Sequence, residues 1–325
     1  MSISKFLDPK NDIAFRRIFG SEKNKDILIH FVNDILELKD KDRIKEVTFL
    51  STIQDPEIAS KKQSIVDILC EDENGVKIIV EMQVSPQEGF EKRAQYYAAK
   101  AYSRQLYKGK KEGARYVDLK AVIFIAISDN IIFPNKVFYK SDHVILDKNT
   151  YAHDLKDFSF TFIELPKFKI TDINLLTNII EKWCYFFKNA DRTSEADLQK
   201  IIGSDEVIER AYEELNQFNW TEEELITYDQ EIKRVMDNQA AEDYKFGKVQ
   251  QMLVEAQKKM SEAEVKAAEA EVKAAKAKEE GVEKGREEGV MKVAINMLKQ
   301  KLEDTLIKQV TGFSQDELDK LKNKM

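Results

Sequence analysis

The sequence of 325 residues is poor in cysteine, histidine and proline. It contains two cysteines, three histidines and five prolines. Both cysteines, Cys70 and Cys184, lie in apolar segments, so we interpret them as core thiols of a reduced compartment rather than a disulfide framework. The histidines lack the short spacing of zinc ligands, which argues against a zinc site. No run of about eighteen apolar residues and no apolar signal segment occurs. We therefore expect a cytoplasmic protein that does not use a membrane.

Charge is abundant but unevenly distributed. Hydrophobic residues make up 42% of the chain, enough for a core, and charged residues make up 34%. The net charge of −7 argues at first against a partner such as DNA. However, basic residues outnumber acidic ones over residues 88–120, and the acidic excess lies in residues 191–243. An acidic protein with one basic face can still bind a polyanion. The basic residues are Lys92, Arg93, Lys100, Arg104, Lys108, Lys110, Lys111, Arg115 and Lys120.

The most informative stretch covers residues 64–84. Two apolar runs flank a polar turn that contains Gly75, a pattern typical of a β-hairpin. Three polar residues lie inside these runs, namely Asp67, Glu81 and Gln83. Carboxylates in strands that are apolar on both sides are costly unless they are paired or bound to a cation.

The length of the hairpin loop decides whether these three residues lie together. A two-residue loop would pair Asp67 with Met82 and place Glu81 on the opposite face. A three-residue loop, with Gly75 in the left-handed conformation, would pair Asp67 with Glu81 and bring Gln83 onto the same face. Opposed Cβ atoms about 5 Å apart would let both carboxylates hold one divalent ion. An exposed edge hairpin with solvated acids is the alternative.

Asp67, a hairpin and then Glu81-Met82-Gln83 resemble the active-site signature of the PD-(D/E)XK nuclease superfamily, with Gln83 in place of its lysine. The surrounding chain resembles one branch of it, the recombination-promoting nuclease (Rpn) or transposase family. The segments that carry the resemblance lie in the first half of the chain, at residues 8–19, 66–68, 80–83, 93–97 and 102–106.

The resemblance implies an α/β fold with a restriction-endonuclease-like core, a mixed sheet flanked by helices, and a Mg²⁺-dependent DNA endonuclease. Mn²⁺ and Ca²⁺ are alternative ions. Asp67, Glu81 and the backbone carbonyl of Met82 would bind the metal. Gln83 would orient water or phosphate without supplying positive charge. The implied roles are recombination, mobile-element biology or phage defence. The alternative is a weak or inactive core that serves as a DNA-binding or oligomerising regulatory module.

Further candidates flank the hairpin. Asp12 lies near the start of a helix, where we interpret it as a cap, with support of the metal site as its second candidate role. A later amphipathic helix can place Arg93, Lys100 and Arg104 on one face, which suits contacts with DNA phosphates. A solvated helix face is the alternative for these three residues.

Apolar periodicity predicts the order of the elements and four parts of the chain. We expect helices over 12–37, broken at Gly20, and over 88–107, strands over 44–51, 117–128 and 158–165, and a polar connection over 54–62. From residue 172 onward the pattern is all-α. The expected parts are a nuclease-like core over 1–170, an acidic helical subdomain over 171–247, a long helix over 248–292 and a small helical module over 293–325.

The long helix is rich in Ala, Glu and Lys and contains a heptad repeat, residues 263–269 and then 270–276. The apolar seam of this repeat contains only Ala and Val and would bury little surface. Two structures therefore stay open, a single exposed helix and a loose oligomeric coiled coil. Glycine recurs at every fourth residue over 281–289. This spacing indicates either a helix face that a partner backbone approaches closely or a flexible hinge.

The last module resembles a truncated helix-turn-helix, yet its balanced charge favours protein interaction or oligomerisation over reading DNA. We therefore expect a homo-oligomer formed through the C-terminal helices. An internal start, with candidates at Met252, Met260 and Met291, would yield a short tail-derived regulator.

Overall fold

The computed structural model describes residues 5–54, 64–106, 115–203 and 205–324. The chain divides into two compact units, Met1–Ala241 and Glu242–Met325, which are described one at a time. Most of the connection expected over 54–62 lies outside the described residues, as do the basic residues Lys108, Lys110 and Lys111.

A six-stranded mixed sheet forms the centre of the first unit, in the order β1-β4-β5-β6-β8-β7. Its strands are β1 (Val47–Phe49), β4 (Ile68–Asp72), β5 (Lys77–Gln83), β6 (Val122–Ser128), β7 (Lys140–Val144) and β8 (Phe158–Glu164). The neighbours β5, β6 and β8 run parallel, and the other pairs are antiparallel. A separate pairing joins β2 (Ile53–Gln54) and β3 (Ser64–Ile65). The strand expected over 117–128 begins at Val122, because Asp118 closes a turn with Arg115.

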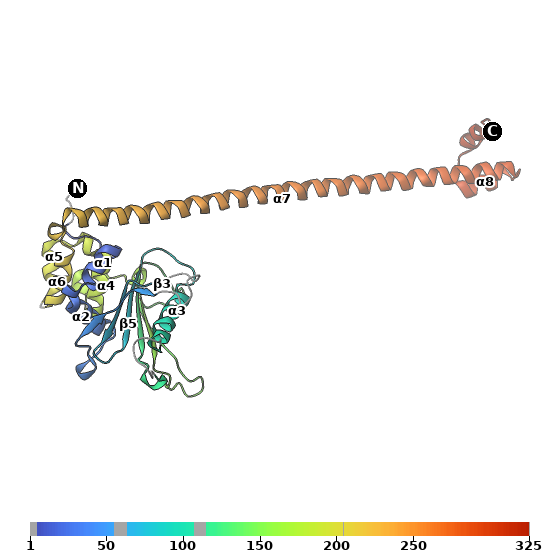
Figure 1. The fold of residues 1–325 in the computed structure, drawn as a ribbon. Helices are drawn as coiled ribbons and strands as arrows, with labels where there is room; N and C mark the ends of the chain where they lie inside the picture. The colour runs from blue at the N-terminus through green and yellow to red at the C-terminus, as the bar shows by residue number, and fades with distance from the viewer. Residues whose placement is uncertain (1–4, 55–63, 107–114, 204, 325) are drawn as a thin grey trace. The chain divides into compact units, whose positions relative to one another are not determined.

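Helices cover both faces of the sheet (Figure 1). One face carries α1 (Asp12–Phe19), α2 (Lys25–Ile35), α4 (Ile179–Asn189), α5 (Glu195–Ile202) and α6 (Glu206–Glu214), and the other carries α3 (Phe90–Ser103). Alternation along β5 explains the two layers. Ile78 and Val80 belong to the core that contains Trp183, whereas Ile79 belongs to the core that contains Ala94 of α3. The predicted mixed sheet flanked by helices is confirmed.

The helices after residue 170 complete this core. Trp183 packs edge-on against Phe31 of α2, and its indole N–H donates to Asp34 at 2.8 Å. Acidic residues of the same region pair with α1, where Arg17 donates to Glu214 at 3.2 Å. The expected boundary at residue 170 therefore does not separate two packed units, because the apolar stripe of α4 is buried against α1 and α2.

The helix α7 (Glu222–Lys299) is unbroken over 78 residues, so the boundary expected near residue 247 is not a break in structure. It begins with a capping box, a pattern of Thr followed three residues later by Glu. Thr221 N–H donates to the Glu224 carboxylate at 2.8 Å, and Glu224 N–H donates to Thr221 Oγ1 at 3.2 Å. Gly247 and the later glycines lie inside the helix, each with open space beside its Cα.

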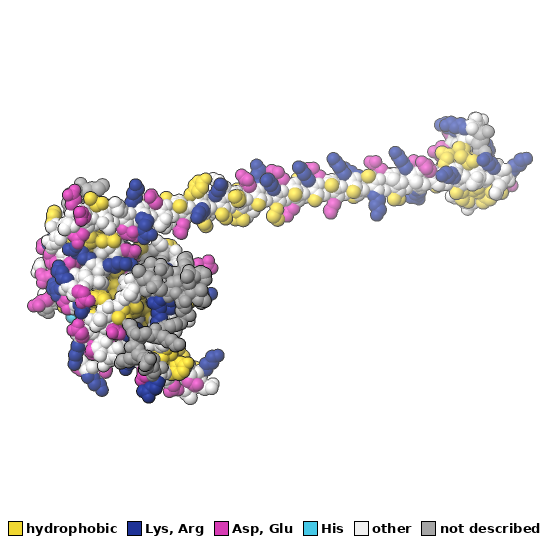
Figure 2. All heavy atoms as spheres, viewed as in Figure 1, with side chains coloured by type: hydrophobic (Ala, Val, Ile, Leu, Met, Phe, Trp, Pro, Cys, Tyr) yellow, Lys and Arg dark blue, Asp and Glu magenta, His cyan; other side chains and the backbone are white. Residues whose placement is uncertain are grey.

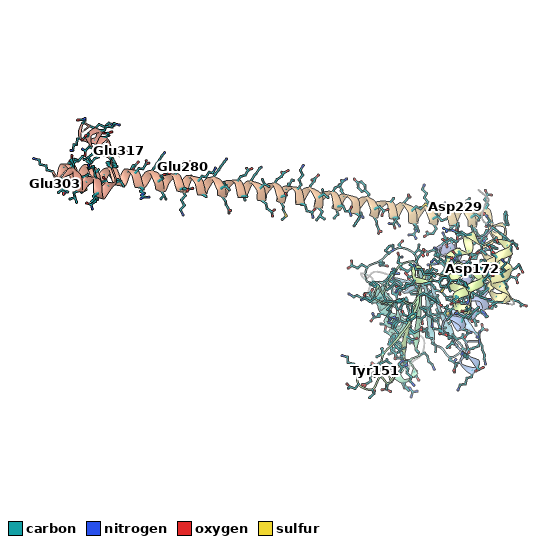
Figure 3. The ribbon with its side chains drawn as sticks, turned by 180° about the vertical axis from the view of Figure 1, so that it is seen from behind. Tyr151, Asp172, Asp229, Glu280, Glu303 and Glu317 are labelled. Atoms are coloured by element: carbon teal, nitrogen blue, oxygen red, sulfur yellow. The ribbon has the colours of Figure 1, made fainter. Side chains whose placement is uncertain are left out.

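Two short helices, α8 (Asp304–Thr311) and α9 (Gln315–Lys322), follow in the second unit. They pack with the end of α7 through a small core that includes Ala294, Ile307 and Leu318. Both helices have capped ends. Gly312 is left-handed after α8, and Ser314 forms a capping box with Glu317, labelled in Figure 3. Among the residues described, no helix is long and apolar enough to cross a bilayer.

Truncation tests where the first unit ends. A chain of residues 1–170 will not fold cooperatively, because it lacks Trp183 and the rest of α4, α5 and α6, which bury α1 and α2. A chain of residues 1–241 will unfold in one cooperative thermal transition, followed by circular dichroism. A cooperative transition in the shorter chain would contradict this account.

Candidate active site

The hairpin of β4 and β5 has the register of a three-residue loop. Its pairs include Ile68 with Val80, so Asp67 and Glu81 come next and face each other. Gly75 closes the loop with a φ of 81°, the left-handed conformation that the sequence predicts. The side chains of Asp67, Glu81 and Gln83 therefore lie on the face of the sheet that α3 covers.

The two strands diverge at Asp67. A continued ladder would pair Val66 with Met82, but Val66 N–H donates instead to the Thr52 carbonyl at 3.2 Å. Met82 N–H then donates to the Asp67 carboxylate at 2.9 Å, so a side chain replaces the main-chain acceptor. In an antiparallel ladder the N–H and C=O of one residue point to the same neighbour. The Met82 carbonyl is thus directed to the edge where Asp67 lies.

The two carboxylates are close and shielded from water. Asp67 N–H donates to Glu81 Oε2 at 3.1 Å, and the side chains of Asp67 and Glu81 are 15% and 7% exposed. Each has a cation as its second partner. Arg16 lies 3.4 Å from Asp67 Oδ1, and Arg93 lies 3.2 Å from Glu81 Oε1. Both arginines approach from helices, α1 and α3, that cover opposite faces of the sheet.

Burial controls the ionisation of this pair. Desolvation raises the pKa of Glu81, and the nearby charge of Asp67 raises it further. Desolvation also raises the pKa of Asp67, although the hydrogen bond from Met82 N–H opposes this. Two carboxyl groups at this separation cannot both ionise without cost, and Arg16 and Arg93 offset only part of it, so a bound metal ion would favour the doubly ionised pair.

Arg93 bridges the site in a way that the sequence pattern did not predict. Its guanidinium, which packs on the Phe90 ring, donates to Glu81 at 3.2 Å and also to the side-chain oxygens of Gln83 and Gln87. We expected Arg93 to contact phosphate together with Lys100 and Arg104. The structure places the Arg93 guanidinium against Glu81, and phosphate contact by these three residues stays a prediction. Lys100 and Arg104, farther along the same segment, are partly exposed.

Asp12 does not cap α1. The cap is Asn11, whose side chain accepts from Ile13 N–H at 2.9 Å, and Asp12 is the first helical residue. Its charge nevertheless acts at the site, because it raises the pKa of both Asp67 and Glu81. Its second candidate role, support of a metal site, stays a prediction.

Two basic residues near the site had no role assigned from the sequence. Arg16 contacts Asp67, as described above, and Lys10 forms a 2.8 Å ion pair with Asp129. Asp129 N–H in turn donates to the Gln83 carbonyl at 2.9 Å, which ties Lys10 to the end of β5. Both residues lie in the segment 8–19, and its cluster of Lys and Arg was the only signal.

The oxygen atoms at this site suit a hard divalent ion. In the described ranges no group of three or more His, Cys, Asp or Glu side chains is placed to hold a metal. Asp67, Glu81 and the Met82 carbonyl are the predicted protein ligands. Mg²⁺ commonly takes one or two carboxylates and keeps several waters, so this donor set fits it.

Comparisons with known proteins identify the family of the chain. Residues 9–245 match the model of the PD-(D/E)XK nuclease family transposase, and residues 287–323 match that of the Rpn/YhgA-like nuclease family C-terminal helix-turn-helix (HTH) domain. The first match extends through α4, α5 and α6, in accord with their place in the core. Searches of curated proteins and of solved structures return no match. The chain therefore belongs to the PD-(D/E)XK nuclease transposase family and ends in an Rpn-type C-terminal HTH domain.

Proposed function

We propose that this protein is a divalent-metal-dependent endonuclease that hydrolyses phosphodiester bonds in DNA. The observation that carries the proposal is the buried, opposed pair of Asp67 and Glu81 beside a main-chain carbonyl directed to the same edge. A carboxylate pair whose pKa values are raised is costly to the fold and gains most from a bound cation. We take Mg²⁺ as the ion in the cell, with Mn²⁺ and Ca²⁺ as alternatives.

The chain's own residues have separable tasks in this proposal. When bound, the ion would polarise the phosphate and lower the pKa of a water molecule. Asp67 and Glu81 hold that position, and the hydrogen bond from Met82 N–H fixes the Asp67 carboxylate. Gln83 orients water or phosphate through its amide. A pocket lined by Gln83 and Ser128, at the carboxyl ends of β5 and β6, leaves room beside it.

Arg93 supplies the positive charge that Gln83 lacks. The family signature has a lysine at the position of Gln83, and a glutamine carries no charge. The Arg93 guanidinium contacts both Glu81 and the Gln83 side chain. A substrate phosphate at this site would therefore meet a fixed guanidinium, which stabilises charge that develops during the reaction.

DNA is the proposed partner. Lys100 and Arg104, both partly exposed, would contact its phosphates, and the HTH domain provides a second element suited to DNA. We infer a role in recombination, mobile-element biology or phage defence in the cytoplasm. Self-association through the C-terminal helices, and a tail-derived product that starts at Met252, Met260 or Met291, are further parts of the proposal.

Nicking of supercoiled plasmid tests the proposed activity. The wild-type chain will nick with Mg²⁺ or Mn²⁺ and not with EDTA. Asp67→Ala and Glu81→Ala will each lower the rate at least about 100-fold, because losing a metal ligand removes several kcal/mol of charge stabilisation. Asp154→Ala, at an exposed position, is the control. Equal activity in all variants would refute the site. An inactive wild type that Mg²⁺ still stabilises would favour a binding module.

The metal-free fold should be strained by the carboxylate pair. Because the folded state raises both pKa values, it holds a proton that the unfolded chain releases, so stability falls as pH rises from about 4 toward neutrality. Asp67→Asn, measured in EDTA, will therefore raise the free energy of unfolding at pH 7 by about 1 kcal/mol, roughly one pKa unit.

The same thermal unfolding measurements test whether Mg²⁺ binds at this site. Mg²⁺ will raise the melting temperature of the wild type and not of Asp67→Asn, whereas Asp154→Asn will behave like the wild type. An Asp67→Asn chain that is less stable in EDTA at pH 7 would contradict the proposed strain.

A rescue experiment tests the role of Arg93. Arg93→Ala will lower single-turnover cleavage about 100-fold, the usual effect of losing one preorganised donor. If Arg93 supplies the charge that Gln83 lacks, then Gln83→Lys will restore much of the rate in the Arg93→Ala chain. Lys100→Ala should instead weaken DNA binding and reduce its salt dependence without changing the single-turnover rate at saturating DNA. Failure of Gln83→Lys to restore cleavage in a folded chain would count against this role.

A further inference from the structure

The unbroken path of α7 extends the heptad repeat far beyond the segment in which the sequence shows it. Counted at alternating steps of three and four residues, the a and d positions run from residue 246 to residue 277 without a charged or polar residue. These positions are Phe246, Val249, Leu253, Ala256, Met260, Ala263, Ala267, Ala270, Ala274 and Ala277. The seam ends at Gly281, the next a position.

Within the described part of the single chain, no other element packs against this seam. Every side chain over residues 241–289 is exposed, and the larger members of the seam, Phe246, Leu253 and Met260, are 65%, 59% and 65% exposed. Figure 2 shows hydrophobic side chains gathered along this part of the helix. A helix in water gains most of its stability from burying one apolar face. A continuous uncovered stripe on a helix of this length therefore needs a partner.

No other line of α7 offers an equivalent seam. Val265 and Val272 lie at the outward f positions of the same heptads. Their column also contains Lys258 and Glu279, two charged residues that would be buried if this face were covered. The side chains of α7 project on all sides of the helix, with Glu280 labelled in Figure 3. Only the line from Phe246 to Ala277 is apolar throughout.

Charges beside the seam specify the partner and its direction. Lysines occupy the g positions 259 and 266, and glutamates occupy the e positions 264 and 271. In a parallel pair in register, each g residue faces the e residue five positions later on the other helix. Lys259 would then face Glu264 of the second copy, and Lys266 would face its Glu271, each pair occurring twice by symmetry.

An antiparallel pair opposes g with g and e with e, which sets lysine near lysine and glutamate near glutamate over these heptads. One like-charged contact remains in the parallel pair, between Lys273 and Lys278, close to the end of the seam. The balance favours the parallel arrangement, with four attractive contacts against two repulsive ones.

We propose that residues 246–277 of two copies of this chain form a parallel, in-register, two-stranded coiled coil. The inference specifies the self-association proposed above and rests on no part of the nuclease chemistry. Because α8 and α9 follow at the C-terminal end of α7, parallel pairing brings two HTH domains to one end of the coil. Paired HTH units bind DNA half-sites related by two-fold symmetry. The coiled coil would thus convert a single HTH domain into a dimeric DNA-binding unit.

Single cysteines test the direction and register in the full chain. The native Cys70 and Cys184 are buried, so under native conditions an added cysteine can be followed alone. Ala256→Cys and Ala270→Cys, both at d positions, will each give a disulfide-linked dimer on mild oxidation, whereas Val272→Cys, at an f position, will give little. An antiparallel pair would place neither position opposite its own copy. Cross-linking at neither or at only one d position would therefore overturn the proposal, as would equal cross-linking in Val272→Cys.

Charge exchange tests the contacts beside the seam. By sedimentation the wild-type chain will have twice the chain mass at micromolar concentration. An acidic variant, Lys259→Glu with Lys266→Glu, and a basic variant, Glu264→Lys with Glu271→Lys, will each dimerise at least about tenfold more weakly. Their equimolar mixture will recover a heterodimer. A monomeric wild type, or variants that dimerise as well as it does, would overturn the proposal and leave the nuclease site untouched.

Discussion

The constraint on which the first unit depends is the burial of two carboxylates at the point where β4 and β5 separate. Asp67 accepts the Met82 N–H that a continued ladder would have bonded to main chain, and its own N–H binds Glu81. Where the strands diverge, the Asp67 side chain thus accepts the hydrogen bond of a backbone N–H, and carboxylate oxygens line the edge of β5. Everything else about the site, from the arginines that flank it to the raised pKa values, follows from placing two acids where little water reaches them.

The rest of the unit holds this divergence in place. The parallel centre of the sheet is covered on one face by α3 and on the other by helices drawn from both ends of the unit, from α1 near residue 12 to α6 near residue 214. Because α1 brings Arg16 and α3 brings Arg93 to the same pair of acids, the two layers are coupled through the site. The match of the family over residues 9–245 describes the same packed unit.

Much of this was predictable from local chemistry. Counting loop residues limited the hairpin to two registers, and the left-handed Gly75 of the structure selects the one that sets Asp67 opposite Glu81. The caps of α7, α8 and α9 were predictable for the same reason, since a cap depends on neighbours a few positions away. The contact of Arg93 with Glu81 was not, because a long side chain on an amphipathic helix can turn outward or inward, and only the packing of α3 decides which.

By itself, then, the sequence determined the central strands to within a few residues, the caps of α7, α8 and α9, and the acidic residues of the hairpin. These features depend on residues near in the chain. Tertiary structure alone decided that residues 171–241 belong to the nuclease unit, and that Arg16 and Arg93 meet the carboxylates. It also decided that α7 is one continuous helix, although three glycines lie near its end. The physical reason is that long-range packing depends on how whole apolar faces fit together, and periodicity shows that a face exists without showing what covers it.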